Sequence, residues 1–333
     1  MNKKIIYIFT LTKEKAIMEK NFKNKLRNMP IAIVPTMVGA ATLSNVYQGL
    51  GFTWIKHITI WAAILILLSY LGKIVFHFDA VKSEYSNTVP ASLYAGLTMI
   101  TMIIGSYVFT YNQTIGKGLW FVGLILHAIH ICVFTFRNVF KGINKETFVP
   151  SWFVTYNGIM VATVVGGVMN EPAIGKVIVY YGITILCIIM PFMVYRLAKH
   201  SIKDAMYHTQ AILLAPSSLC LVSYLNFIEK PNKIVVYALY ALAFCSFLFI
   251  LYKMPKFFGF TFNPGFAGLT FPMAIGIVAS TKMSAFLIAQ GNESFGSIVK
   301  EISGIQIYIT TAIIGFVLYN FARMLVRSYK NNG

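Results

Sequence analysis

Charge is scarce in this chain, and negative charge is the scarcest. Only 11% of the 333 residues are charged, whereas a soluble protein carries about 25%. Ten acidic residues stand against 28 Lys and Arg, which gives a net charge of +18. A nucleic-acid partner would be the usual explanation for a soluble chain this basic. Here the basic residues flank long apolar stretches, so neither a soluble domain nor nucleic-acid binding is expected.

Cysteine and recognisable chemical motifs are also sparse. The four cysteines all fall in apolar stretches, and none forms a CxxC pair: Cys132, Cys187, Cys220 and Cys245. They are interpreted as small buried apolar residues rather than a disulfide or zinc framework. His127 and His130 are three residues apart, but two ligands without a third favour packing over metal binding. No nucleophile motif stands in a suitable context, so no cofactor, metal or enzyme activity is expected.

Apolar residues make up 57% of the chain and recur in long runs. A bilayer core needs about 20 apolar residues in a helix, and the runs are continuous rather than alternating as in a barrel strand. The sequence predicts an all-α integral membrane protein with ten spans, at 31–49, 55–78, 89–111, 118–136, 149–169, 174–197, 211–228, 234–252, 265–288 and 302–325. Residues 1–29 then form a basic cytoplasmic segment, 30–326 the membrane domain, and 327–333 a cytoplasmic tail.

The basic residues predict how these spans are oriented. With ten spans both termini lie on one side, and that side collects 21 Lys and Arg against 7 on the other. Short loops rich in Lys and Arg stay in the cytoplasm. Both termini are therefore expected to be cytoplasmic, with the protein in the cell (plasma) membrane.

A proline recurs in every second span. The set is spaced 55 to 66 residues apart and comprises Pro35, Pro90, Pro150, Pro216 and Pro272. That spacing fits a pair of helices and a loop, so the chain is predicted to contain five helical-hairpin repeats. Among the even spans only the sixth has an internal proline, Pro191.

The prolines and the small residues after them suggest an inner ring of five kinked helices around a pore, with an outer ring of five. Proline frees a backbone carbonyl, which in a membrane must lie against protein or water. Glycine and proline are, however, also frequent in membrane helices generally. The pore-lining candidates are Val34, Pro35, Gly39, Val89, Pro90, Gly96, Val149, Pro150, Gly158, Ala215, Pro216, Pro272 and Gly276.

Such a lumen would contain no acid or base. Pumps and coupled transporters usually carry a carboxylate relay within the membrane, and conduction needs weak binding. The pattern therefore favours a passive channel for small anions over its alternative, a proton-coupled transporter of C4-dicarboxylates such as malate or succinate. A membrane enzyme or structural protein has no chemical motif behind it.

Phe271 is the exception among the five residues that precede the prolines. Four are Val or Ala, at Val34, Val89, Val149 and Ala215. A single aromatic ring crossing a narrow apolar lumen would close it, so Phe271 is the candidate gate. The alternative is a phenylalanine packed in the core, which 27 Phe residues make common.

Three stretches carry a resemblance to a known family: FTFNPGFAGLTFPMAIGIVAST, PSWFVTYNGIMVA and AILLAPSSLCLVSY. In order and spacing they resemble the ninth, fifth and seventh helices of the tellurite-resistance/dicarboxylate transporter family. That family includes bacterial tellurite-resistance membrane proteins and plant guard-cell slow anion channels. The resemblance extends over residues 30–326.

The resemblance implies a homotrimer whose subunits each have a pore ringed by five kinked helices. It also implies a phenylalanine gate in the ninth helix, which falls on Phe271. Two departures stand out. The phosphoregulatory tails of the plant channels are absent, and the match around MPIAIVPTMVGAATL is weaker, which leaves the register of Pro30 against Pro35 open. Family members differ in substrate, so the resemblance does not name the anion.

Overall fold

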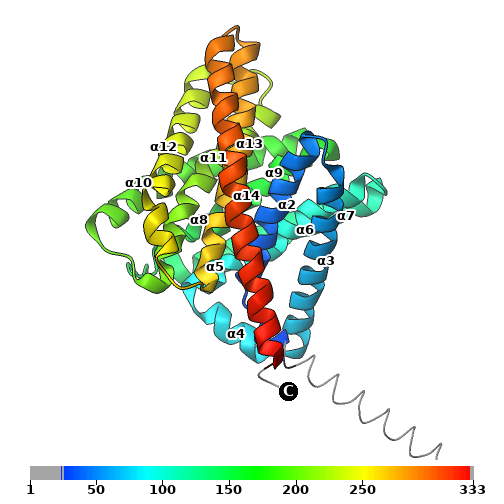
Figure 1. The fold of residues 1–333 in the computed structure, drawn as a ribbon, viewed down its shortest axis with the longest axis vertical. Helices are drawn as coiled ribbons and strands as arrows, with labels where there is room; N and C mark the ends of the chain where they lie inside the picture. The colour runs from blue at the N-terminus through cyan, green and yellow to red at the C-terminus, as the bar shows by residue number, and fades with distance from the viewer. Residues whose placement is uncertain (1–23, 25, 331–333) are drawn as a thin grey trace, which may run out of the picture.

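The computed structural model describes residue 24 and residues 26–330, and every regular element in that part of the chain is a helix (Figure 1). Most of the predicted N-terminal segment 1–29 and the end of the predicted tail 327–333 lie outside the described residues. Different segments lie at the two ends of the molecule. The short helix α4 (Phe78–Ser86) lies at the bottom of Figure 1, and the turn between α13 (Thr270–Ala289) and α14 (Glu293–Lys330) lies at the top.

Eight helices of the described chain are long and apolar enough to cross a membrane. They are Thr53–Phe76, Thr88–Phe109, Gln113–Phe140, Pro172–Lys199, Asp204–Phe227, Lys233–Phe258, Pro264–Ala289 and Glu293–Arg327. Each overlaps one of the ten predicted spans, and some begin several residues earlier than predicted. The individual elements are α3 (Thr53–Phe76), α5 (Thr88–Leu93), α6 (Ala95–Phe109), α7 (Gln113–Thr135), the π-helical turn η1 (Phe136–Phe140), α10 (Pro172–Lys199), the 3₁₀ helix η4 (Asp204–Leu213), α11 (Leu214–Phe227), α12 (Lys233–Phe258), the 3₁₀ helix η5 (Pro264–Leu269), α13 (Thr270–Ala289) and α14 (Glu293–Lys330).

The other two predicted spans are shorter or broken. The span 31–49 corresponds to α2 (Ile33–Gly49), which has 17 residues. The span 149–169 is divided into four short pieces: α8 (Trp152–Tyr156), the 3₁₀ helix η2 (Gly158–Met160), α9 (Val161–Val165) and the 3₁₀ helix η3 (Gly166–Met169). The count of ten spans and the five-hairpin ring therefore remain predictions.

The repeated prolines mark helix beginnings more than interior kinks. Pro35, Pro90, Pro216 and Pro272 are each the third residue of an α-helix, and Pro150 lies two residues before α8. The N–H groups of a first helical turn have no partner within the helix, so proline removes nothing there. The 3₁₀ helices η4 and η5 lead directly into α11 and α13, which keeps these two spans continuous up to the proline.

Burial alternates along the chain as the prolines do. In the most apolar windows of the three long proline-bearing spans, 67% to 83% of residues are buried, against 22% to 39% in the other five. The cysteines follow the same division. Cys220 on α11 is buried, whereas Cys132, Cys187 and Cys245 on α7, α10 and α12 are exposed. The expectation that all four are buried was wrong for these three, because their helices turn much of their surface outward.

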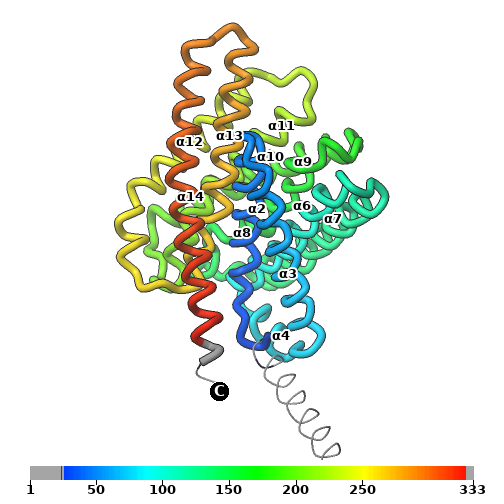
Figure 2. Tube along the Cα trace, turned by 45° about the vertical axis from the view of Figure 1, so that its right-hand side comes forward, coloured from blue at the N-terminus to red at the C-terminus, as the bar shows by residue number. Residues whose placement is uncertain are grey.

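The proline-bearing helices α2 and α13 lie side by side (Figure 2), and glycines allow their close approach. A Cβ atom on Gly39 of α2 would lie 2.6 Å from the backbone nitrogen of Phe271 on α13. A Cβ on Gly96 of α6 would lie 3.1 Å from the Pro35 ring on α2. Since contacts under about 3 Å force atoms apart, a larger side chain at Gly39 would separate α2 from α13.

Candidate functional site

A small cavity lies among the proline-bearing segments. Its volume is about 30 Å³, enough for a single water molecule by volume. Its thirteen lining residues are all apolar or glycine: Pro35, Leu93, Met99, Phe153, Val154, Gly158, Ile212, Ala215, Leu219, Ala267, Gly268, Phe271 and Pro272. Every one of them belongs to one of the five proline-bearing segments, and we call this space the central cavity.

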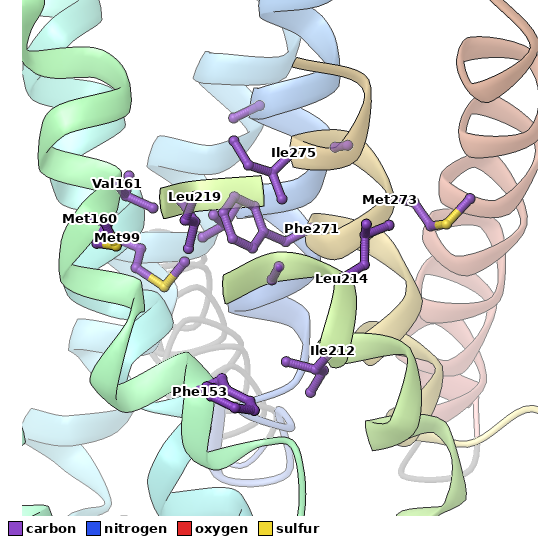
Figure 3. Packing of buried hydrophobic residues seen from close by; sticks show 14 of the residues in the cluster. Met99, Phe153, Met160, Val161, Ile212, Leu214, Leu219, Phe271, Met273 and Ile275 are labelled. Carbon is purple, nitrogen blue, oxygen red and sulfur yellow. The ribbon is translucent and has the colours of Figure 1, made fainter. Parts of the chain in front are cut away.

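Phe271 forms one wall of the central cavity. Its ring extends from α13 toward Leu219 of α11, with Met99 and Val161 beyond, whereas Met273 on the same helix points away (Figure 3). The side chain is largely buried, with 7% of its surface exposed. Its backbone is held against α2, where Gly39 leaves room for it. The backbone of Phe271 is thus packed against α2, and its ring extends toward α11 and lines the cavity.

A larger cavity adjoins the central one on the side of α4. It has a volume of about 510 Å³, and its lining includes Asn87, Thr88, Thr147 and Thr209. Among the described residues that line it, Glu84 is the only ionisable one, and we call it the Glu84 cavity. Four residues line both this space and the central cavity: Leu93, Ile212, Ala267 and Gly268.

A second large cavity adjoins Phe271 on the opposite side. Its volume is about 630 Å³. Lys56, Lys282 and Lys300 line it, and none of the described residues around it is acidic; we call it the lysine cavity. Phe271 lines both this space and the central cavity. The three cavities therefore follow one another, with the ring of Phe271 between the central cavity and the lysine cavity.

The three lysines give the lysine cavity a positive potential. A cleft lined by charge of one sign concentrates ions of the opposite sign, and its weakly polarisable walls strengthen the effect. Lys56 donates a hydrogen bond to Gln48 Oε1 at 2.7 Å. With lysine charges and polar side chains such as Thr42 and Ser303 around it, this space suits anions.

The predicted site residues divide evenly between the cavities and the packed core. Seven line one of the three cavities: Pro35, Val89, Pro90, Gly158, Ala215, Phe271 and Pro272. The other seven do not border them: Val34, Gly39, Gly96, Val149, Pro150, Pro216 and Gly276. Of this second group, Gly39, Gly96 and Gly276 lie at close contacts between proline-bearing helices.

Several cavity residues escaped prediction from the sequence. Leu93, Met99, Ile212 and Leu219 line the central cavity, yet in sequence they are ordinary apolar residues within apolar runs. In the sequence, the lysines of the lysine cavity served only to predict the orientation of the spans. Glu84 had no signal, because it stands in a polar stretch between two spans.

The histidine pair lies in the packing between helices. His127 is fully buried; its Nδ1 lies 2.6 Å from Thr98 Oγ1, and its Nε2 lies 2.9 Å from the Thr155 carbonyl oxygen. His130 contacts the hydroxyl groups of Tyr85 and Thr155. Both nitrogens of His127 are therefore engaged by α6 and α8, which accounts for it as a packing residue.

These features define a multi-pass helical membrane protein with an uncharged internal cavity between two wider ones, of which one is lined by Glu84 and the other by three lysines. Comparison with known proteins gives the family. The family model of SLAC1, voltage-dependent anion channel, matches residues 28–325. The chain belongs to this family, whose members are channels and transporters rather than enzymes.

A curated relative agrees with this assignment. The chain is 21% identical over 245 residues to a protein described as tellurite resistance protein TehA homolog, from Haemophilus influenzae. The match covers 72% of this chain and 74% of the relative. The family resemblance inferred from the sequence is thereby confirmed.

Proposed function

We propose that the protein is a passive channel for small anions, with a conduction path inside each subunit. The path runs from the Glu84 cavity through the central cavity to the lysine cavity. The observation that carries this proposal is the lining of the central cavity, which draws on all five proline-bearing segments and contains no charge. An ion crossing it finds no fixed charge to hold it, so release is rapid.

Phe271 is the gate of the proposed path. Its ring separates a space of about 30 Å³ from one of about 630 Å³. An anion that must leave water to pass an apolar constriction faces a large desolvation cost, so a ring in this position closes the path. The three lysines raise the local anion concentration on the far side of the ring.

A flux assay in liposomes tests the function. Purified protein is reconstituted, and the efflux of chloride, nitrate, malate and succinate is followed down imposed gradients. A channel releases anions at a rate set by the gradient and the voltage, without proton movement. Protein-free liposomes and heat-inactivated protein are the controls. No anion efflux above these controls, from vesicles in which protein incorporation is verified, would refute the proposal.

The second candidate is a proton-coupled transporter of C4-dicarboxylates. Glu84 supports this candidate, because its carboxylate lines a cavity that adjoins the central one. Coupled transporters use such carboxylates to carry protons. The same liposomes loaded with a pH-sensitive dye distinguish the two. Succinate-driven proton uptake at a fixed ratio supports the transporter, and anion movement without it supports the channel.

The remaining features of the proposal concern assembly and topology. We propose a homotrimer in the plasma membrane, with ten spans and both termini in the cytoplasm. The trimer rests on the family resemblance, and the orientation rests on the distribution of Lys and Arg. In this orientation the Glu84 cavity opens to the cytoplasm and the lysine cavity to the outside.

A further inference from the structure

Hydrogen-bond donors from two helical segments converge on the carboxylate of Glu84. Lys73 of α3 donates to Glu84 Oε1. The hydroxyl groups of Tyr70 and Tyr94 donate to Glu84 Oε2 at 2.7 and 3.0 Å. One ammonium group and two phenolic hydroxyls thus surround one carboxylate, which is the arrangement of an anion-binding site.

These donors are built into the protein rather than gathered at its surface. The side chain of Lys73 is fully buried, and its ammonium also donates to the Met29 carbonyl oxygen at 2.7 Å. Tyr70 is fully buried and Tyr94 is 8% exposed. The ammonium lies 5.2 Å from the centre of the Tyr70 ring. Buried charges are rare unless they are paired, so this donor set requires an anion.

Glu84 lies at the boundary between the donors and the Glu84 cavity. Its side chain is 30% exposed, and it is the only ionisable residue among the described lining of that cavity. A carboxylate without a partner would repel anions from this end of the path. The ion pair with Lys73 neutralises this negative charge. The Glu84 carboxylate thus occupies the donors as a bound anion would, except that it is covalently attached to the chain.

We propose that Lys73, Tyr70 and Tyr94 form an anion-binding site of the conduction path, which Glu84 occupies as an internal carboxylate. A small carboxylate or nitrate-like oxyanion takes its place when Glu84 is removed or neutralised. The link to conduction rests on the proposed function, because it requires the Glu84 cavity to belong to the path. A tethered group has an effective concentration in the millimolar range or above, so free anions compete poorly while Glu84 is present.

The first experiment vacates the site and offers a substitute for the lost carboxylate. Glu84→Ala is purified in detergent, and its thermal unfolding is measured against sodium formate, with sodium chloride at equal ionic strength as the reference. The variant should unfold at a lower temperature than the wild type, because Lys73 is left buried without a counter-charge. Formate should then raise the unfolding temperature by about 2 °C or more, as expected for a ligand that binds only the folded state.

Two variants serve as controls. Glu84→Ala combined with Lys73→Met lacks the ammonium and should gain nothing from formate. Asp79→Ala removes another carboxylate of α4, one that pairs with Arg27 at 2.6 Å, is exposed and does not line the cavity. Formate should leave its unfolding temperature unchanged. Equal stabilisation of all variants, or of none, would overturn the anion site.

The second experiment measures flux and separates this inference from the proposed function. Glu84→Gln keeps the size of the side chain and removes the charge, so it covers the case in which Glu84→Ala fails to fold. In liposomes it should pass nitrate at least twofold faster than the wild type. If the wild type conducts nitrate and Glu84→Gln conducts it at the same rate, the site has no role in conduction. Absence of flux in both, with formate rescue intact, rejects the channel and leaves the anion site standing.

Discussion

Replacing Phe271 by alanine should open the path between the central cavity and the lysine cavity. The ring vacates a space on the order of that of benzene, for which cavities of about 150 Å³ are known. This adds to a central cavity of about 30 Å³. One water occupies about 30 Å³ in the liquid, so the enlarged space has the volume of several waters, and without the ring it opens directly onto the lysine cavity. An anion can then cross with part of its hydration shell.

The expected result is an anion flux at least tenfold above wild type, which corresponds to about 1.4 kcal/mol off the barrier. Chloride efflux from liposomes measures it, normalised to the amount of folded protein incorporated. Normalisation matters because truncating a core phenylalanine costs about 3–5 kcal/mol of stability. Phe271→Leu leaves a smaller opening and should give an intermediate flux.

Met273→Ala is the matched control. Met273 lies on the same helix, is 1% exposed and points away from the central cavity (Figure 3). Its truncation costs a comparable amount, about 2–5 kcal/mol, and creates a void elsewhere. The gate is refuted if Met273→Ala raises flux as much as Phe271→Ala, or if Phe271→Ala folds normally and leaves flux unchanged.

Three further predictions concern charge, packing and topology. Lys282→Gln with Lys300→Gln should lower chloride flux several-fold in 10 mM salt and little in 1 M salt, because the screening length falls from about 30 Å to about 3 Å; an effect independent of salt would contradict electrostatic attraction. Gly39→Ala should lower the free energy of unfolding by about 1–3 kcal/mol, since the added methyl group meets the backbone of α13, and thermal unfolding in detergent measures it. A reporter fused after Gly333 should signal from the cytoplasm, and a signal from the other side would reverse the topology.

The proline repeat was readable from the sequence because the chemistry of proline is local. The spans that carry these prolines are the more buried ones: Cys220 falls in a buried span, whereas Cys132 does not, although both were expected to be buried. The phase of each helix could not be read in the same way. Pro35 borders the central cavity while Val34 beside it is fully buried. A helix that is apolar on every side carries no periodic signal to tell which face meets a cavity.

Glu84 shows a second limit of the sequence. Its partners Lys73 and Tyr70 stand 11 and 14 residues earlier in the chain, and only the turn between α3 and α4 brings them together. In sequence the lysine belongs to an apolar span and the glutamate to a polar stretch. Their pairing depends on the tertiary fold, so residue type and spacing gave no indication of it.

The contact at Gly39 has a consequence for how the proposed gate can move. The backbone of Phe271 lies so close to α2 that not even a methyl group fits between them. Protein interiors are packed too densely for such a joint to slide, so the main chain of Phe271 behaves as a fixed pivot. Opening then requires the ring to turn about its own side-chain bonds while the helix stays in place. Conduction would accordingly flicker with the rotations of one side chain, rather than wait for a rearrangement of the whole bundle.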